Sequence, residues 1–183
     1  MIHRLHLVIL ISAAIFLSLN IASAEPLKAS GLDMIEPDEY EIFNAVLDKY
    51  DAFISFEKMT ISEKRLDNAA IKHLTQSGVQ VDNYLAEDFN EKNSRSYELE
   101  KRFSKKRYFI DESYPVLPGS GKEGIKISRA GFNKEKNQAL IFIRYQIIGP
   151  QEAFYEEGNF VFLERKEGKW IVIKTAMASQ RYY

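Results

Sequence analysis

The chain has 183 residues, enough for one self-sufficient hydrophobic core, and a formal net charge of −1. This balance of charges argues against a protein that binds nucleic acid or an anionic membrane through a global electrostatic field. The absence of cysteine excludes disulfides and thiolate zinc sites, so the fold must depend on its packed core.

The first 24 residues have the pattern of a secretory signal peptide. Arg4 precedes an apolar stretch over residues 5–19, and Ala22-Ser23-Ala24 supplies the small residues that a signal peptidase requires. The apolar stretch is shorter than the roughly 20 residues of a membrane-spanning helix. We therefore expect cleavage after Ala24, one domain over residues 25–183 with no membrane span, and a location in the bacterial periplasm or outside the cell.

Helical periodicity dominates the first half of this domain. Glu36-Pro37-Asp38 suits a first helical turn, and apolar residues then recur at spacings of three and four. These residues are Tyr40, Phe43, Val46, Leu47 and Tyr50. Residues 53–61 are rich in β-formers and predict an extra strand. Residues 62–92 predict two shorter helices because Gly78 interrupts them. The two apolar stripes comprise Leu66, Ala69, Ala70, His73 and Leu74, then Val81, Tyr84, Leu85 and Phe89.

From Gly124 onward the sequence has the signals of β-strands. Four strands are predicted, over residues 125–129, 139–148, 159–165 and 170–177, and we expect an antiparallel meander. Both alternating faces of 139–143 are apolar, which predicts a central strand with helices on one face and loops or a partner on the other. The expected fold class is α+β, with N-terminal helices packed on a C-terminal meander of about four strands plus one extra strand.

Few residues point to catalysis. His73 is the only histidine after residue 24, and nothing near it in the sequence supplies a nucleophile or an orienting acid. Asp111-Glu112 and Glu156-Glu157 invite comparison with glycosidases, but adjacent residues in a strand point to opposite faces. No acidic segment has the spacing of a calcium loop. We expect no catalytic residue, no metal and no cofactor. The alternative is a small cell-envelope hydrolase that uses acids around residues 93–121 and in the Glu156-Glu157 region.

The segment from Arg95 to Tyr108 is the strongest candidate for a binding site. It combines basic and aromatic side chains, which can bind phosphate groups, anionic glycans or nucleic acid. Its candidate residues are Arg95, Tyr97, Lys101, Arg102, Lys105, Lys106, Arg107 and Tyr108. Glu98, Glu100 and the slightly negative chain oppose a nucleic-acid partner. The expected function is a non-enzymatic binding module for an anionic envelope polymer or another exported protein, and a carrier of an amphiphilic ligand is a further alternative.

The stretch from residue 125 to residue 143 has a structural interpretation. Ile125, Ile127 and Phe132 are expected in the core, Gly131 at a bulge, and Asn133 and Asn137 in a turn. In a regular strand Ser128 and Arg129 point to opposite faces, which argues against a joint site. Arg129 is instead expected to pair with an acid on a neighbouring strand.

Several segments of this half resemble a family of uncharacterised bacterial secreted proteins. They are Ser128-Arg129-Ala130-Gly131-Phe132-Asn133-Lys134, Gln138-Ala139-Leu140, Leu163-Glu164-Arg165-Lys166-Glu167-Gly168-Lys169-Trp170 and, upstream, Ser96-Tyr97-x-Leu99. Where those proteins often have a glycine-rich and sometimes cysteine-containing connection, this chain has residues 148–154, IGPQEAF. The resemblance implies a shared fold, but it does not carry any known activity over to this chain.

Overall fold

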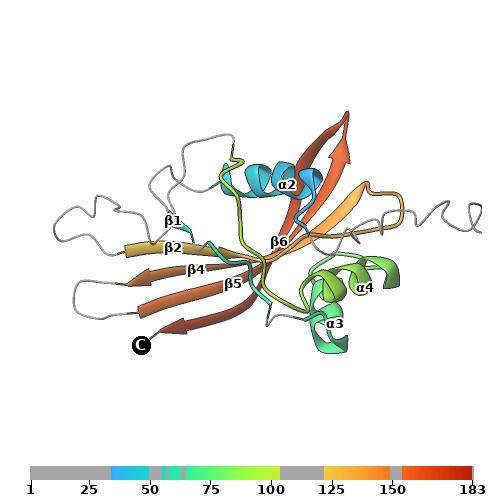
Figure 1. Ribbon diagram of the computed structural model, residues 1–183. Helices are drawn as coiled ribbons and strands as arrows, with labels where there is room; N and C mark the ends of the chain where they lie inside the picture. The colour runs from blue at the N-terminus through green and yellow to red at the C-terminus, as the bar shows by residue number, and fades with distance from the viewer. Residues whose placement is uncertain are drawn as a thin grey trace, which may run out of the picture. The chain divides into compact units, whose positions relative to one another are not determined.

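The computed structural model describes residues 34–49, 55–56, 58–62, 65–103, 122–148 and 154–182, all within one compact unit. The expected signal peptide lies outside them. Three helices occur in this part of the chain, α2 (Pro37–Leu47), α3 (Asn68–Gln76) and α4 (Asn83–Lys92) (Figure 1). The strands are β1 (Ser55–Phe56), β2 (Lys122–Ile127), β3 (Gly131–Phe132), β4 (Gln138–Ile148), β5 (Phe154–Lys166) and β6 (Lys169–Tyr182). Within these ranges, no helix combines the length and hydrophobicity needed to cross a bilayer.

The strands form one sheet in the order β1-β2-β4-β5-β6, with the short β3 paired to β4. Strand β1 runs parallel to β2, and every other pair is antiparallel. The predicted α+β class, the four-stranded meander and the extra strand are therefore confirmed. Two predicted strands were too short, because β5 begins at Phe154 and β6 continues to Tyr182.

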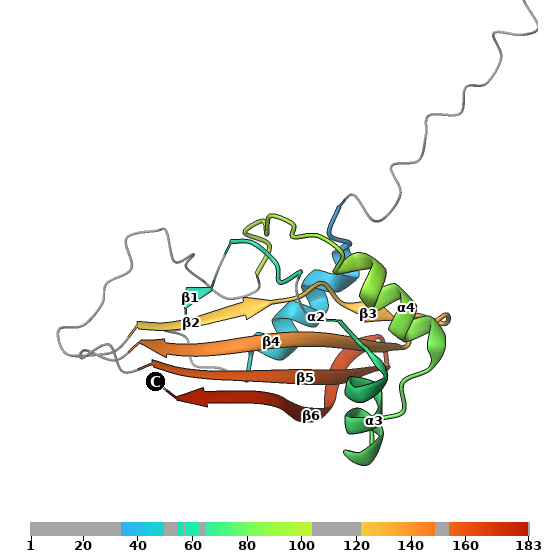
Figure 2. The ribbon, with the colours of Figure 1, turned by 90° about the horizontal axis from the view of Figure 1, so that it is seen from below.

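Helices cover both faces of the sheet (Figures 1 and 2). On one face α2 packs against the odd-numbered residues of β4, such as Ile141 and Ile143. On the other face α3 and α4 pack against even-numbered residues such as Leu140 and Phe142. The expectation of helices on one face and loops or a partner on the other was wrong. The central position of β4, predicted from its two apolar faces, is confirmed.

Local sequence explains where the helices begin and end. Pro37 occupies the first turn of α2, and the carboxylates of Asp67 and Asp82 cap α3 and α4 by accepting from Ala70 N and Leu85 N. Gly78 has a φ of +83° between α3 and α4, which confirms the predicted break.

Not every residue of the predicted apolar stripes is buried. Tyr84 is 52% exposed and His73 is also exposed, so neither belongs to the core.

Strands β5 and β6 form a long hairpin with a two-residue turn. Its central residues Glu167 and Gly168 have φ angles of 52° and 78°, as a turn that matches the twist of the strands requires. Two register shifts along the pair leave Ile173 and Ala178 as extra residues in β6.

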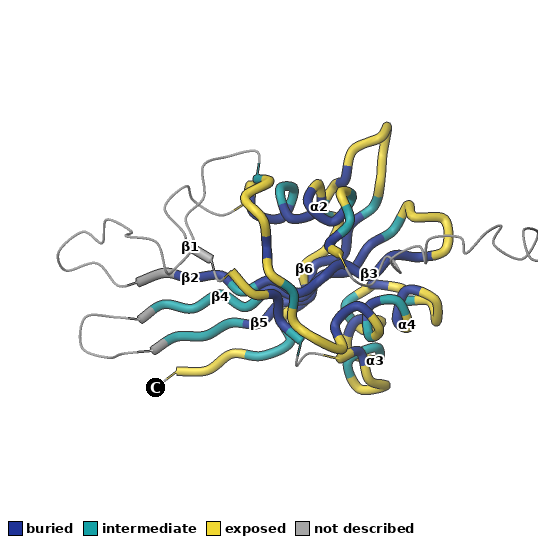
Figure 3. Tube along the Cα trace, viewed as in Figure 1, coloured by how far each residue is buried: buried dark blue, intermediate teal, exposed yellow. Residues whose placement is uncertain are grey.

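The sheet extends beyond the three described helices at the end formed by the last residues of β4 and β6 and the first residues of β5. There the backbone passes from buried through intermediate to exposed (Figure 3). Tyr145 and Tyr155 are partly exposed at this end, and Tyr182 is 70% exposed.

Candidate functional site

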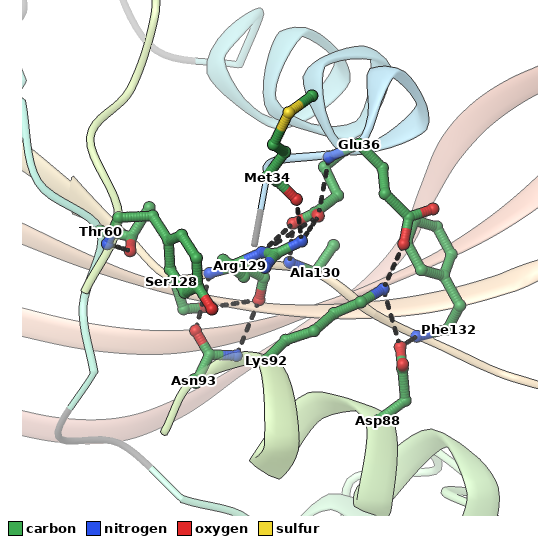
Figure 4. A network of polar contacts seen from close by, with 12 residues as sticks. Met34, Glu36, Thr60, Asp88, Lys92, Asn93, Ser128, Arg129, Ala130 and Phe132 are labelled. Atoms are coloured by element: carbon green, nitrogen blue, oxygen red, sulfur yellow. Dashed lines mark hydrogen bonds and ion pairs between the residues drawn. The ribbon is translucent and has the colours of Figure 1, made fainter. Parts of the chain in front are cut away.

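An extensive buried polar network surrounds Arg129, between β2 and β3 (Figure 4). Its guanidinium donates to the Glu39 carboxylate of α2, with an Nη2–Oε1 distance of 2.6 Å, and also to the carbonyl of Met34, 2.7 Å away. Both charged side chains have an exposed fraction of 0%. The sequence correctly predicted a paired Arg129, but its partner lies on a helix and not on a neighbouring strand.

Hydrogen bonds satisfy the charges of this buried pair. Glu39 accepts from the backbone N–H groups of Glu36 and Ala130 as well as from Arg129. Burial alone would lower the pKa of Arg129, but the hydrogen bonds and charge of Glu39 outweigh burial and raise it. Arg129 therefore stays charged inside the protein.

The backbone around Arg129 is held equally firmly. Asn93, at the end of α4, accepts from Arg129 N and donates to its carbonyl, at 2.8 and 3.0 Å. Ser128 Oγ accepts from Phe142 N and donates to the Arg129 carbonyl. A second cluster beside it joins Lys92 to Glu36 and Asp88, at 3.2 and 3.1 Å. Because the Arg129–Glu39 pair is buried, and Lys92 is engaged by Glu36 and Asp88, the network holds separate segments of the chain together.

Gly131 directly follows this network. The close approach of α4 explains why this position is glycine, and not the bulge that the sequence predicted. A Cβ atom at this position would lie 2.5 Å from Cβ and 2.6 Å from Cα of Phe89 in α4. The glycine therefore allows the helix backbone to approach the sheet closely. The burial of Ile125, Ile127 and Phe132 is confirmed. So is the turn, in which Asn133 Oδ1 accepts from the backbone of residues 137 and 138.

The described part of the predicted basic segment runs along residues 58–61. Thr60 N donates to Tyr97 O and Leu99 N donates to Lys58 O, so the segment has an extended, sheet-like pairing. Tyr97 is partly buried, and its ring contacts the guanidinium groups of Arg129 and Arg95, at 4.5 and 4.9 Å.

The exposed side chains of this segment already have electrostatic partners. Arg102 pairs with Glu100 at 2.6 Å, Lys58 pairs with Glu98 at 2.7 Å, and Lys101 also has an interaction partner. The remaining candidates, Lys105, Lys106, Arg107 and Tyr108, lie outside the described residues. The anion-binding role of this segment stays a prediction.

His73 has a structural role that its sequence position did not reveal. Its Nε2 donates to the carbonyl of Met177, 2.7 Å away, next to the extra residue Ala178 of β6. The contact ties α3 to the sheet where the regular strand pairing is interrupted. A pocket of about 280 Å³ adjoins His73 and is lined by Arg65, Asp67, Ala69, Ala70, Phe160 and Ala178. The Asp67 carboxylate there is already engaged as the cap of α3.

The acidic pair in β5 has the predicted geometry. Glu156 accepts from Gln146 and lies near Arg144, whereas Glu157 accepts from Tyr155 and Asn159. These partners place the two carboxylates on opposite faces of the sheet, as the alternation of a strand requires. The other pair, Asp111-Glu112, lies outside the described residues. Within the described part of the chain, no group of three or more histidine or acidic side chains could hold a metal ion.

The exposed end of the sheet places Glu157 beside tyrosines that the sequence did not single out. Strand register places Tyr145 opposite Glu157 and Tyr155 opposite Tyr182, all on the α2 face. The ring centroids of Tyr145 and Tyr155 are 6.4 Å apart, and those of Tyr155 and Tyr182 are 5.1 Å apart. We call this region the tyrosine surface, formed by Tyr145, Tyr155, Glu157, Asn159, Gln180 and Tyr182.

Hydrogen bonds connect the polar groups of the tyrosine surface. The hydroxyl of Tyr155 and the buried amide of Asn159 donate to the two oxygens of Glu157. Gln180 Nε2 lies 2.8 Å from the hydroxyl of Tyr182 and 3.3 Å from that of Tyr155.

The hydrogen bonds from Tyr155 and Asn159 hold the pKa of Glu157 below its usual range. The hydrogen bond with Glu157 raises the pKa of the Tyr155 hydroxyl. At neutral pH the surface therefore presents the ionised carboxylate of Glu157 beside the neutral phenol of Tyr155.

Sequence reasoning missed this surface because its residues are distant along the chain. The segment from Tyr155 to Gly158 has no apolar alternation and was not predicted as strand. Only the pairing of β5 with β4 and β6 places Tyr145, Tyr155 and Tyr182 side by side. The available signal was that three tyrosines lie near the ends of predicted strands.

No protein-family model, no curated protein and no solved structure matches the chain. The resemblance to a family of secreted bacterial proteins accordingly stays an expectation drawn from short segments.

Proposed function

We propose that the chain is an exported, non-enzymatic binding module and that its ligand binds at the tyrosine surface. The observation that carries this proposal is the row of three tyrosines on three adjacent strands, at the end of the sheet that the described helices leave exposed. Tyrosine combines a large apolar ring with a polar tip, and it is enriched where proteins bind partners.

The hydrogen bonds of the surface also favour binding. Glu157 is held by Tyr155 and Asn159, and Gln180 bridges the hydroxyls of Tyr155 and Tyr182. Side chains that are already oriented lose less conformational entropy when a ligand arrives, so more of the contact energy remains as affinity.

Export is the part of the proposal that rests on the sequence of the first 24 residues. Arg4, the apolar stretch and Ala22-Ser23-Ala24 support a cleaved signal peptide. N-terminal sequencing of protein recovered from the periplasm or the medium is expected to begin at Glu25. An intact N-terminus at Met1 in that material would contradict cleavage.

Substitution of the tyrosines tests the binding role. We expect Tyr182→Ala and Tyr155→Ala to weaken binding of a ligand of this surface at least about tenfold, as removal of a central aromatic anchor does. The ligand is sought by nuclear magnetic resonance titration of the isotopically labelled protein with envelope saccharides, peptides and organic cations.

Tyr84→Ala is the matched control, because Tyr84 is 52% exposed but lies on α4. This variant is expected to bind as the unsubstituted protein does. Equal losses in the Tyr84 and Tyr182 variants, or a titration in which no compound shifts the resonances of the tyrosine surface, would refute the proposed site. Because the tyrosines are partly or largely exposed, thermal unfolding is expected to change little in all three variants.

A further inference from the structure

We propose that the tyrosine surface binds a free quaternary ammonium compound, with Glu157 as the counter-ion and the rings of Tyr155 and Tyr182 as its aromatic contacts. This inference rests on the proposed binding function and adds the chemical class of the ligand. Three features of the surface lead to it.

The first feature is a carboxylate without a cationic partner. Both hydrogen-bond donors to Glu157, Tyr155 and Asn159, are neutral, and no cation among the described residues pairs with it. Other partly buried acids in the same chain do have such partners, for example Glu156 with Arg144 and Glu36 with Lys92. The lowered pKa of Glu157 keeps its negative charge available to a ligand.

The second feature is the aromatic neighbourhood of this charge. The faces of tyrosine rings are negative, and a cation within about 6 Å of a ring centroid is attracted to them. The ring centroids of Tyr155 and Tyr182 are 5.1 Å apart, so one bound cation can lie within about 6 Å of both centroids. The carboxylate of Glu157 adds a charge attraction that the rings alone do not supply.

The third feature is the use of the hydrogen-bonding groups. The oxygens of Glu157 already accept from Asn159 and Tyr155, and the hydroxyls of Tyr155 and Tyr182 are engaged by Gln180. A primary ammonium ion must replace its hydration shell with several acceptors, whereas a quaternary ammonium ion has no N–H group to satisfy. Charge and ring faces, which this surface supplies, are what the quaternary ion needs.

The arrangement of charge across the sheet supports this choice. Strand alternation places Arg144 and Arg181 on the opposite face, where Glu156 lies directly opposite Arg181 and 3.7 Å from Arg144. The face that carries Glu157 and the tyrosines is therefore separated from these two arginines by the sheet, and an anionic ligand finds neither of them there.

A pair of ligands with equal shape isolates the effect of charge. In 3,3-dimethylbutan-1-ol a carbon atom replaces the quaternary nitrogen of choline. We expect calorimetric titration of the protein to give at least about tenfold tighter binding of choline than of this alcohol. The preference is expected to shrink as sodium chloride is raised, because exposed charges are screened.

Charge-neutral variants of the two adjacent acids provide the matched test. Glu157→Gln keeps the size of the side chain and is expected to lower the affinity for choline to that for the alcohol. Glu156→Gln, on the opposite face, is expected to leave the affinity for choline unchanged. Because the pKa of Glu157 is lowered, the preference for choline should persist at the usual glutamate pKa of about 4.3 and disappear only below it.

Several results would overturn the inference. Equal affinities for choline and the alcohol, or an undiminished preference in the Glu157→Gln variant, would exclude Glu157 as a counter-ion. If both ligands bind equally and Tyr182→Ala abolishes both, the ligand class is wrong while the binding surface stands. Binding to phosphatidylcholine vesicles without binding to choline would replace the free compound by a lipid headgroup. Failure of all screened compounds would refute the proposed function together with this inference.

Discussion

At Arg129 one side chain fixes the position of segments that are far apart in the sequence. The guanidinium binds Glu39 of α2 and the carbonyl of Met34, while the backbone of the same residue binds Asn93 at the end of α4. The sequence predicted that Arg129 would be paired. It did not predict the partner, because the pattern of a strand determines which face a residue occupies and not which helix covers that face.

Removal of the partner of Arg129 should strongly destabilise the fold. Glu39→Ala leaves a buried guanidinium without its counter-charge, and we expect the free energy of unfolding to fall by about 3 to 5 kcal/mol. Urea denaturation followed by circular dichroism measures this change. Glu41→Ala on the same helix removes an exposed carboxylate 3.8 Å from Arg165 and should change stability by less than about 0.5 kcal/mol. A loss below about 1 kcal/mol for Glu39→Ala would show that the pair is dispensable.

Among the elements, the agreement between sequence and structure depends on apolar patterning. The alternation of 139–143 predicted a central strand because both faces are apolar, and the structure confirms it. The polar ends of β5 and β6 were missed, since Tyr155, Glu157 and Gln180 carry no hydrophobic alternation. Their strand conformation comes from pairing with β4 and with each other, which are contacts between distant parts of the chain. The candidate site lies in this region, so the sequence alone could not locate it.

The packing of α4 on the sheet gives a prediction for Gly131. In Gly131→Ala the new methyl group would lie 2.5 Å from Phe89 Cβ and 2.7 Å from its backbone nitrogen, so the helix must shift. We expect a loss of about 1 to 3 kcal/mol in the free energy of unfolding, measured by urea denaturation.

The contact with Gly131 involves the backbone and Cβ of Phe89, which Phe89→Ala retains. The smaller side chain in the double variant, Gly131→Ala with Phe89→Ala, should therefore not reduce the cost of Gly131→Ala. A double variant more stable than Phe89→Ala alone would contradict this explanation.

At the scale of the whole molecule, salt bridges connect α2, α4 and the turn between β3 and β4. Glu36 lies 2.7 Å from Lys136 of the turn and 3.2 Å from Lys92 of α4. Burial alone would raise the pKa of Glu36, but Lys136 and Lys92 together outweigh burial and lower it. The hydrogen bond with Glu36 raises the pKa of Lys136. The protonation of Glu36 and of Lys136 is therefore coupled to the folding of the unit.

These shifts predict a plateau of stability with pH. A carboxylate with a lowered folded pKa stabilises the protein above its unfolded value of about 4.3, and this contribution is lost as pH falls through the folded pKa. A lysine with a raised folded pKa contributes below about 10.4, and its contribution is lost as pH rises through the folded pKa. We expect the free energy of unfolding to be nearly constant from about pH 5 to pH 10 and to decline on both sides.

Urea denaturation at a series of pH values measures this profile, and Glu36→Gln should make the decline on the acid side shallower. An acid limb that is identical in this variant and in the unsubstituted protein would show that Glu36 does not contribute to it.

The extra residues Ile173 and Ala178 have a consequence for how molecules of this protein meet one another. Strand β6 ends the sheet on one side, and a long, flat edge strand is a template onto which a second chain can add. Each bulge bends the strand and interrupts the even spacing of its N–H and C=O groups. An incoming strand therefore finds no continuous row of partners, and β6 can extend to Tyr182 without turning the sheet into a seed for aggregation.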